Sequence, residues 1–133
     1  MYKLYFDGAS RNNPGLSGYG CVILDDNNKE CFIYYDKFNS PQTNNYAEYY
    51  GLYKGLQLAI KNNIKNIQVY GDSNLVIQQM NKKWKMKSDN LREIFDKCQE
   101  LLYRFDSIVF THILRKFNKR ADELANMAID NKM

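Results

Sequence analysis

The sequence predicts a single α/β domain with a mixed β-sheet flanked by helices. At 133 residues the chain is long enough for one hydrophobic core and too short for two. Segments with strand periodicity alternate with segments of helical periodicity in the order β-β-β-α-β-α-α-β-α. The first strands are joined without helices and the later ones through helices, which predicts three antiparallel strands followed by two parallel strands. We expect residues 1–133 to form one domain.

The N-terminal third is predicted to form three strands. Residues 2–7 alternate in polarity and are rich in aromatic residues, which is typical of a strand. Residues 8–18 contain glycines and a proline and are predicted to form a loop that starts directly after Asp7. Residues 19–25 and 30–38 are predicted to pair as a β-hairpin.

A long helix is predicted over residues 44–62, with Thr43 as its N-cap. Glu48, Leu52 and Ala59 share one face of this helix with Gly55, at spacings of i, i+4, i+7 and i+11. Glu48 is therefore expected to point toward the sheet, although a solvent-exposed glutamate is the usual case.

The C-terminal half is predicted to alternate strands and helices. Strands are expected at residues 66–71 and 107–114, and helices at 74–81, 89–104 and 118–130. The predicted parallel arrangement places the ends of the central strands at one edge of the sheet, where open α/β sheets bind ligands.

Composition restricts the possible function classes. The chain is 44% hydrophobic and 26% charged, with a formal net charge of +4, which suits an anionic partner without requiring one. It contains no apolar segment of transmembrane length and no secretory leader pattern, so we expect an intracellular monomer without membrane association. The three cysteines, Cys21, Cys31 and Cys98, lack metal-site spacing and are expected to be reduced thiols.

Four carboxylates lie at predicted element ends beside polar or small residues: Asp7, Glu48, Asp72 and Asp122. Carboxylates near a core need a cationic partner, and hard divalent ions such as Mg²⁺ prefer oxygen ligands. Mg²⁺ sites commonly act on phosphate esters, so the set predicts a metal-dependent phosphodiesterase. Each acid taken singly has an ordinary alternative, either a solvated charge or a partner of a helix N-terminus.

The segments around these acids resemble those of type 1 ribonucleases H, enzymes that cleave the RNA strand of RNA–DNA hybrids. The resemblance spans essentially the whole chain and is carried by residues 6–15, 43–48, 71–73 and 112–125. It implies a ribonuclease H-like fold. It also implies that Asp7, Glu48, Asp72 and Asp122 bind two Mg²⁺ ions, or Mn²⁺ as a substitute, with Glu48 beside the ribose 2′-hydroxyl.

The same resemblance suggests residues that contact the substrate. Asn44 and Asn45 match positions that contact nucleotides in the minor groove, and Asn13 and Asn74 occupy comparable positions. An amide both donates and accepts hydrogen bonds, which suits such contacts. The alternatives are a helix cap for Asn44 and a turn residue for Asn13.

Two features depart from the common bacterial pattern. The loop before Asp122 is short and lacks the usual histidine; His112 lies in a predicted strand and is expected to be a packed residue. Arg115, as in short-loop members resembling archaeal enzymes, is expected to replace that histidine. Being permanently protonated, it would assist with phosphate charge or product release and cannot act as a base.

The second departure is the segment of residues 81–87, which replaces a basic helix that bacterial members use to grip the DNA strand. Lys83, Trp84 and Lys85 are expected to contact the substrate through phosphate contacts and stacking. A solvated loop with Trp84 packed on the core is an equal alternative.

The expected function is therefore hydrolysis of RNA in RNA–DNA hybrids, giving 5′-phosphate and 3′-hydroxyl ends. A catalytically silent nucleic-acid-binding module on the same fold is the rival from another class. A domain of a reverse transcriptase is disfavoured, because the chain starts at its first predicted strand and ends just after its last helix, as expected of a free-standing protein.

Overall fold

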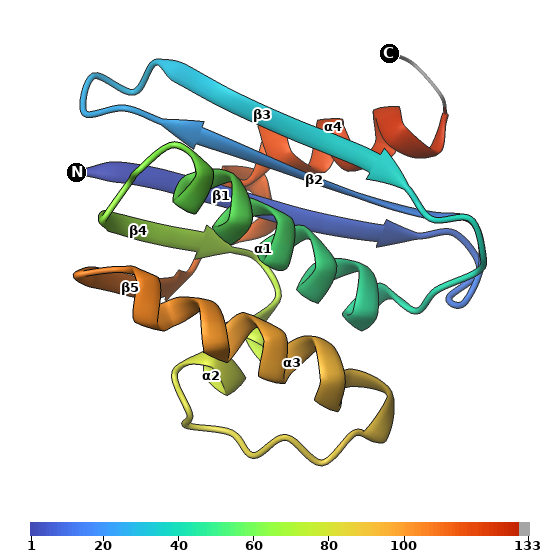
Figure 1. Ribbon diagram of the computed structural model, residues 1–133. Helices are drawn as coiled ribbons and strands as arrows, with labels where there is room; N and C mark the ends of the chain where they lie inside the picture. Colours follow the sequence, from blue (N-terminus) through green and yellow to red (C-terminus); the bar gives the residue numbers. More distant parts are fainter. Residues whose placement is uncertain (131–133) are drawn as a thin grey trace.

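A five-stranded mixed sheet forms the centre of the molecule, as predicted (Figure 1). The structure, a computed structural model, describes residues 1–130; the last three residues of the predicted domain lie outside this part. The sheet order is β3-β2-β1-β4-β5, with β1, β2 and β3 antiparallel and with β4 and β5 continuing parallel to β1. The strands are β1 (Tyr2–Ser10), β2 (Ser17–Leu24), β3 (Glu30–Lys37), β4 (Asn66–Gly71) and β5 (Ser107–His112).

Helices cover both faces of this sheet. Helix α1 packs on β1 and β2, and α3 packs on α1, while α4 lies across β2, β1 and β3 on the opposite face (Figure 1). None of the helices within residues 1–130 has the length and apolar character to cross a membrane. The helices are α1 (Asn44–Lys61), α2 (Asn74–Met80), α3 (Asp89–Leu101) and α4 (Lys119–Ile129), with single 3₁₀ turns η1 (Leu102–Arg104) and η2 (Arg115–Phe117).

Side-chain hydrogen bonds cap the N-termini of α1 and α2, the helices that begin next to the predicted acids. The Thr43 hydroxyl accepts a hydrogen bond from the Tyr46 amide at 3.1 Å, which confirms Thr43 as the cap of α1. Ser73 caps α2 in the same way, through the amide of Val76. These caps place Asn44 and Asp72 directly beside helix N-termini.

The prediction that Asp7 ends its strand is wrong. β1 continues through Ser10, because its antiparallel pairing with β2, which starts at Lys3 opposite Leu24, extends past Asp7 to Ser10 opposite Ser17. The parallel pairing with β4 stops at Tyr5 opposite Tyr70. Asp7 therefore lies within β1 but just beyond the end of its parallel neighbour, where β1 and β4 separate.

Helix α1 lies unusually close to β1. A Cβ atom on Gly51 would stand 2.6 Å from the Asp7 carbonyl oxygen, and one on Gly8 would stand 2.2 Å from the Ala47 carbonyl carbon. The glycines therefore allow backbone-to-backbone contact between helix and strand. This contact brings Glu48, one turn before Gly51, over the strand that carries Asp7.

We predict that Gly51→Ala destabilises the protein despite the better helix propensity of alanine. The added methyl group meets rigid backbone, and such overpacking costs about 1–3 kcal/mol of stability. The better helix propensity of alanine returns only about 1 kcal/mol, so we expect a net loss. Urea unfolding measures the difference. Gly55→Ala is the matched control in the same helix, because the three atoms nearest to its added methyl group belong to the Leu4 side chain and not to backbone. Equal or greater destabilisation in the control would contradict the close-approach argument.

Candidate active site

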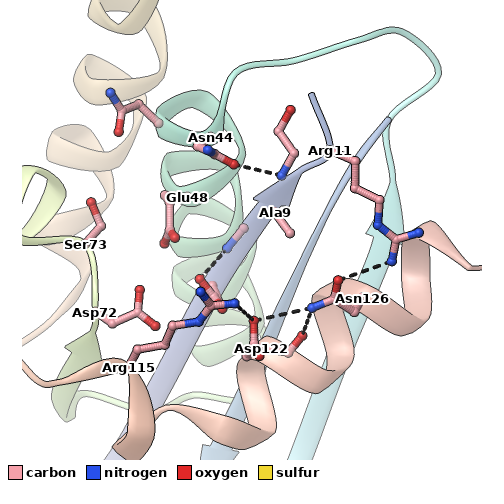
Figure 2. A pocket seen from close by; sticks show the side chains of 13 residues that line it. Ala9, Arg11, Asn44, Glu48, Asp72, Ser73, Arg115, Asp122 and Asn126 are labelled. Carbon is pink, nitrogen blue, oxygen red and sulfur yellow. Dashed lines mark hydrogen bonds and ion pairs between the residues drawn. The ribbon is translucent and has the colours of Figure 1, made fainter. Parts of the chain in front are cut away.

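Three of the four predicted acids converge where β1 and β4 separate. One carboxylate oxygen from each of Asp7, Glu48 and Asp72 lies within 4.8 Å of the others. They come from β1, from the second turn of α1 and from the residue after β4. Figure 2 shows Glu48 and Asp72 directed toward the same space.

The two central acids are buried. Asp7 is only 3% exposed and Glu48 only 8%. The Gly8 amide donates a hydrogen bond to Asp7 Oδ1 at 2.9 Å, whereas the buried Oε2 of Glu48 has no partner among the described residues. An unsatisfied carboxylate oxygen in such a position is costly unless a cation or a proton compensates it.

Burial and mutual repulsion raise the pKa of both acids. Desolvation is the main cause for Asp7; repulsion from Asp72 and Asp122 adds to it, so its pKa rises to about 7. The pKa of Glu48 is raised well above its ordinary value, again by desolvation first and then by the neighbouring Asp7. The metal-free cluster therefore disfavours the charged forms of these two acids, a cost that a bound divalent cation would offset.

Asp122 approaches the other three from α4, on the opposite side of the cluster. Arg115 in η2 donates from Nη2 to Asp122 Oδ1 at 3.5 Å, and Asn126 Nδ2 donates to the same oxygen at 3.3 Å (Figure 2). The Asp122 side chain is 30% exposed and that of Arg115 is 78% exposed. This long ion pair is weak and screened by solvent, so Arg115 is free to move toward an anion.

A cleft of about 470 Å³ opens over the four carboxylates. Its lining combines acids with hydrogen-bonding and basic groups. The lining residues are Asp7, Gly8, Ala9, Ser10, Arg11, Asn44, Asn45, Glu48, Asp72, Ser73, Arg115, Asp122 and Asn126.

Sequence reasoning missed Arg11 and Asn126. Arg11 forms an ion pair with Asp130 at 2.6 Å and donates to Asn126 Oδ1 at 3.2 Å, so it ties the loop after β1 to the end of α4. Asp130, near the end of the described residues, is thus tied to the loop after β1. Asn126 was detectable, because it lies one helical turn after Asp122.

The predicted substrate residues at the start of α1 lie beside the acids. Asn44 and Asn45 both line the cleft. Asn44 does not cap its helix. Its side-chain Oδ1 accepts from the Ser10 backbone amide at 2.8 Å, and its backbone amide donates to Asn13 Oδ1 at 2.9 Å. Asn13 lies next to the cleft, in a neighbouring depression that Asn44 and Asn45 also line.

The remaining predicted substrate residues lie outside the cleft. Asn74 accepts from Gln78 within α2. Lys83, Trp84 and Lys85 belong to the loop after α2, which is held in place because the Lys83 and Trp84 amides both donate to the Gln78 carbonyl. Trp84 is 46% exposed and so is not packed into the core.

The donor set of the cleft fits divalent cations. It offers carboxylate oxygens from four different elements, it is desolvated at Asp7 and Glu48, and one of its buried oxygens is unpartnered. Hard cations such as Mg²⁺ and Mn²⁺ prefer such oxygens. Binding of a cation would offset the repulsion that raises the pKa values of the two buried acids.

The sheet order, the helices on both faces and the acids at the divergence of the central strands define a ribonuclease H-like domain. The model of the family described as Reverse transcriptase-like matches residues 5–128. The Ribonuclease H of a Wolbachia species is 34% identical over an alignment 143 positions long. The alignment covers 95% of this chain and 93% of that protein. The chain belongs to the ribonuclease H family, type 1.

Solved structures agree with this assignment. The ribonuclease H1 of the halophilic archaeon Halobacterium salinarum superposes with a TM-score of 0.93 at 38% identity, covering 98% of both chains. LC11-RNase H1, in its complex with an RNA/DNA hybrid, superposes with a TM-score of 0.91 at 35% identity, again covering 98% of both chains.

Other relatives are longer than this chain. The Ribonuclease HI of Halobacterium salinarum is 39% identical over 127 residues, which are 96% of this chain and 63% of that protein. The Bifunctional protein Rv2228c of Mycobacterium tuberculosis is 38% identical over 124 residues, 93% of this chain and 34% of that protein. The chain thus corresponds to one part of these proteins.

We predict that Asp7→Asn stabilises the metal-free protein at high pH. The folded-state pKa of Asp7 is raised from 3.8 to about 7, so the folded state retains a proton that the unfolded state has released. This contribution to stability is complete below pH 3.8 and is lost as pH rises to about 7. In EDTA at pH 8 the substitution should raise Tm by about 5 °C or more.

The gain should shrink at pH 4.5, and differential scanning fluorimetry at both pH values measures it. Asp96→Asn, at an exposed aspartate of α3, is the control and should change Tm little at either pH. A gain for Asp7→Asn that is the same at both pH values would contradict the proposed burial of its charge.

Proposed function

We propose that this chain is an endoribonuclease that hydrolyses the RNA strand of RNA–DNA hybrids with two divalent cations, leaving 5′-phosphate and 3′-hydroxyl ends. The buried, mutually repelling acids at the floor of a cleft carry the proposal, because a protein that only binds polyanions gains nothing from such a cluster. Membership of the ribonuclease H family and the likeness to LC11-RNase H1, solved with an RNA/DNA hybrid, support the substrate class.

Each acid has a distinct proposed role. Asp7 faces Glu48, Asp72 and Asp122, so it is suited to hold both cations, with Glu48 and Asp72 on the substrate side and Asp122 on the other. When bound, Mg²⁺ or Mn²⁺ activates the attacking water and stabilises the leaving oxygen. The remaining residues of the cleft bind and orient the nucleic acid.

Arg115 is proposed to bind phosphate rather than to move protons. Its guanidinium is always charged, and its weak, exposed pairing with Asp122 allows exchange for a phosphate oxygen. The expectation that His112 is a packed residue is wrong: it is exposed at the last position of β5, and it does not line the cleft. The proton of the attacking water would therefore pass to solvent or to the substrate phosphate.

The start of α1 is proposed to read the ribose. Asn44 and Asn45 lie in the cleft with Glu48, one turn away on the same helix. Because Asn44 Oδ1 is engaged by Ser10, its Nδ2 remains as a donor toward an acceptor on the substrate. Glu48, which lines the same cleft, would accept a hydrogen bond from a 2′-hydroxyl, which distinguishes RNA from DNA.

The rival, a silent binding module, makes a different prediction about metal. An enzyme site that binds cations in the folded state alone should raise Tm as MgCl₂ or MnCl₂ is added, and a module without such a site should show no such rise. The intracellular and monomeric states remain predictions from the sequence.

We predict that Asp72→Asn lowers turnover by orders of magnitude while the fold is kept, because a carboxylate that binds a cation is replaced by a neutral amide. The assay uses end-labelled RNA–DNA hybrid, RNA duplex, DNA duplex and single strands, with Mg²⁺, Mn²⁺ or EDTA. We expect metal-dependent cleavage of the hybrid's RNA strand alone.

The control for this variant is Asp96→Asn, at an exposed acid outside the cleft, which should cleave like wild type. Activity of Asp72→Asn above about a tenth of wild type would contradict the role of Asp72. Absence of cleavage by wild type on every substrate and metal would favour the silent binding module.

We predict that the loop after α2 binds phosphates of the substrate. Lys83→Ala with Lys85→Ala should reduce the slope of log K against log salt by about 1 for each phosphate that the variant no longer binds. Trp84→Ala should weaken binding without changing that slope, because stacking releases no counterions. Hybrid binding to the Asp72→Asn protein at several salt concentrations measures both.

The matched control is Lys61→Ala with Lys65→Ala, two exposed lysines around the C-terminal end of α1, far along the helix from Glu48. If both pairs change the slope equally, the effect is one of net charge and the loop has no specific role.

A further inference from the structure

Asn118 is a buried polar residue with contacts to three acid-bearing elements. It lies at the junction of η2 and α4 and is only 1% exposed. Its Nδ2 donates to the Phe6 carbonyl in β1 at 2.9 Å and to Asp72 Oδ2 at 3.1 Å. The backbone carbonyl of Asn118 accepts a hydrogen bond from the Asp122 backbone amide at 3.1 Å. The residue thus joins the neighbour of Asp7, Asp72 itself and the backbone of Asp122.

The chemistry of the amide requires this orientation. An amide NH₂ group has two hydrogens, and two acceptors lie within reach of Nδ2. If the group were rotated by 180°, Oδ1 would face the Phe6 carbonyl and the Asp72 carboxylate, and three acceptors would repel one another. Neither a carboxylate nor an apolar side chain could replace both bonds.

Local helix energetics do not explain this residue. Asn118 occupies the N-cap position of α4, where asparagine is among the preferred residues, yet its side chain makes no capping bond. Its Oδ1 is buried without a partner among the described residues. The side chain therefore binds the central strand β1 and Asp72 instead of capping the helix that follows it.

We propose that Asn118 is a positioning residue that holds Asp72 at a fixed distance from Asp7 and Asp122 so that the set binds divalent cations. This inference rests on the proposed function. The bond to Oδ2 restricts rotation of the Asp72 carboxylate and leaves its other oxygen for a cation. Residues that orient ligands in this way typically contribute 10–100-fold to metal affinity.

Calorimetric titration with MnCl₂, without nucleic acid, tests the proposal. Asn118→Ala is expected to raise the Kd for Mn²⁺ by about 10–100-fold. Asn118→Ser is the second variant, because its small polar side chain fits the same space and is too short to bridge Phe6 and Asp72. Cleavage of hybrid at low Mn²⁺ should fall in parallel and recover in part at high Mn²⁺.

Asn62→Ala is the matched control. Asn62 donates its side-chain amide to the Leu58 carbonyl at the C-terminal end of α1, so the substitution removes one amide–carbonyl bond away from the acids. This variant should lose some stability in urea and keep wild-type Mn²⁺ affinity.

The outcomes separate the two proposals. Folded Asn118 variants that bind Mn²⁺ as tightly as wild type would overturn the positioning role and leave the proposed function intact. Unfolding of both Asn118 variants would also overturn it, since the residue would then serve the fold alone. A wild-type protein that binds no Mn²⁺ would overturn the proposed function and, with it, this inference.

Discussion

The contact between the backbones of α1 and β1 is the constraint on which the site depends. Gly51 rests against the Asp7 carbonyl and Gly8 against the α1 backbone, so no side chain keeps the helix away from the strand. Glu48 and Asp7 are therefore forced together in a desolvated place. The raised pKa values of both acids follow from that packing, and a bound cation would relieve the same repulsion.

The sequence was sufficient for the sheet, the helix order and the direction of Glu48. The spacing of Glu48, Leu52, Gly55 and Ala59 places them on one face, and all four are buried. The full extent of β1 could not be predicted, because Gly8 and Gly18 resemble loop residues in sequence. In the structure they lie in strands, where the absence of a side chain admits α1 at Gly8 and α4 at Gly18.

The supporting residues of the site could not be deduced in the same way. Asn118 finds its acceptor Phe6 across 112 positions of the chain, and Arg11 finds Asn126 across 115. Local sequence patterns predict the face of a helix or strand on which a side chain lies, but they do not predict which polar group of another segment it will contact. The four acids were identifiable through their flanking segments; the amides that orient them depend on tertiary packing alone.

The carboxylates of the cleft differ in their exposure to solvent. Asp7 and Glu48 are almost wholly buried, whereas Asp122 is held by the solvent-exposed Arg115 and by Asn126, which Arg11 in turn contacts. Dissolved salt weakens interactions between exposed charges and hardly reaches buried ones. Rising ionic strength should therefore weaken the Arg115–Asp122 ion pair on the α4 side of the cleft more than the interactions of the buried Asp7 and Glu48 on the β1 side.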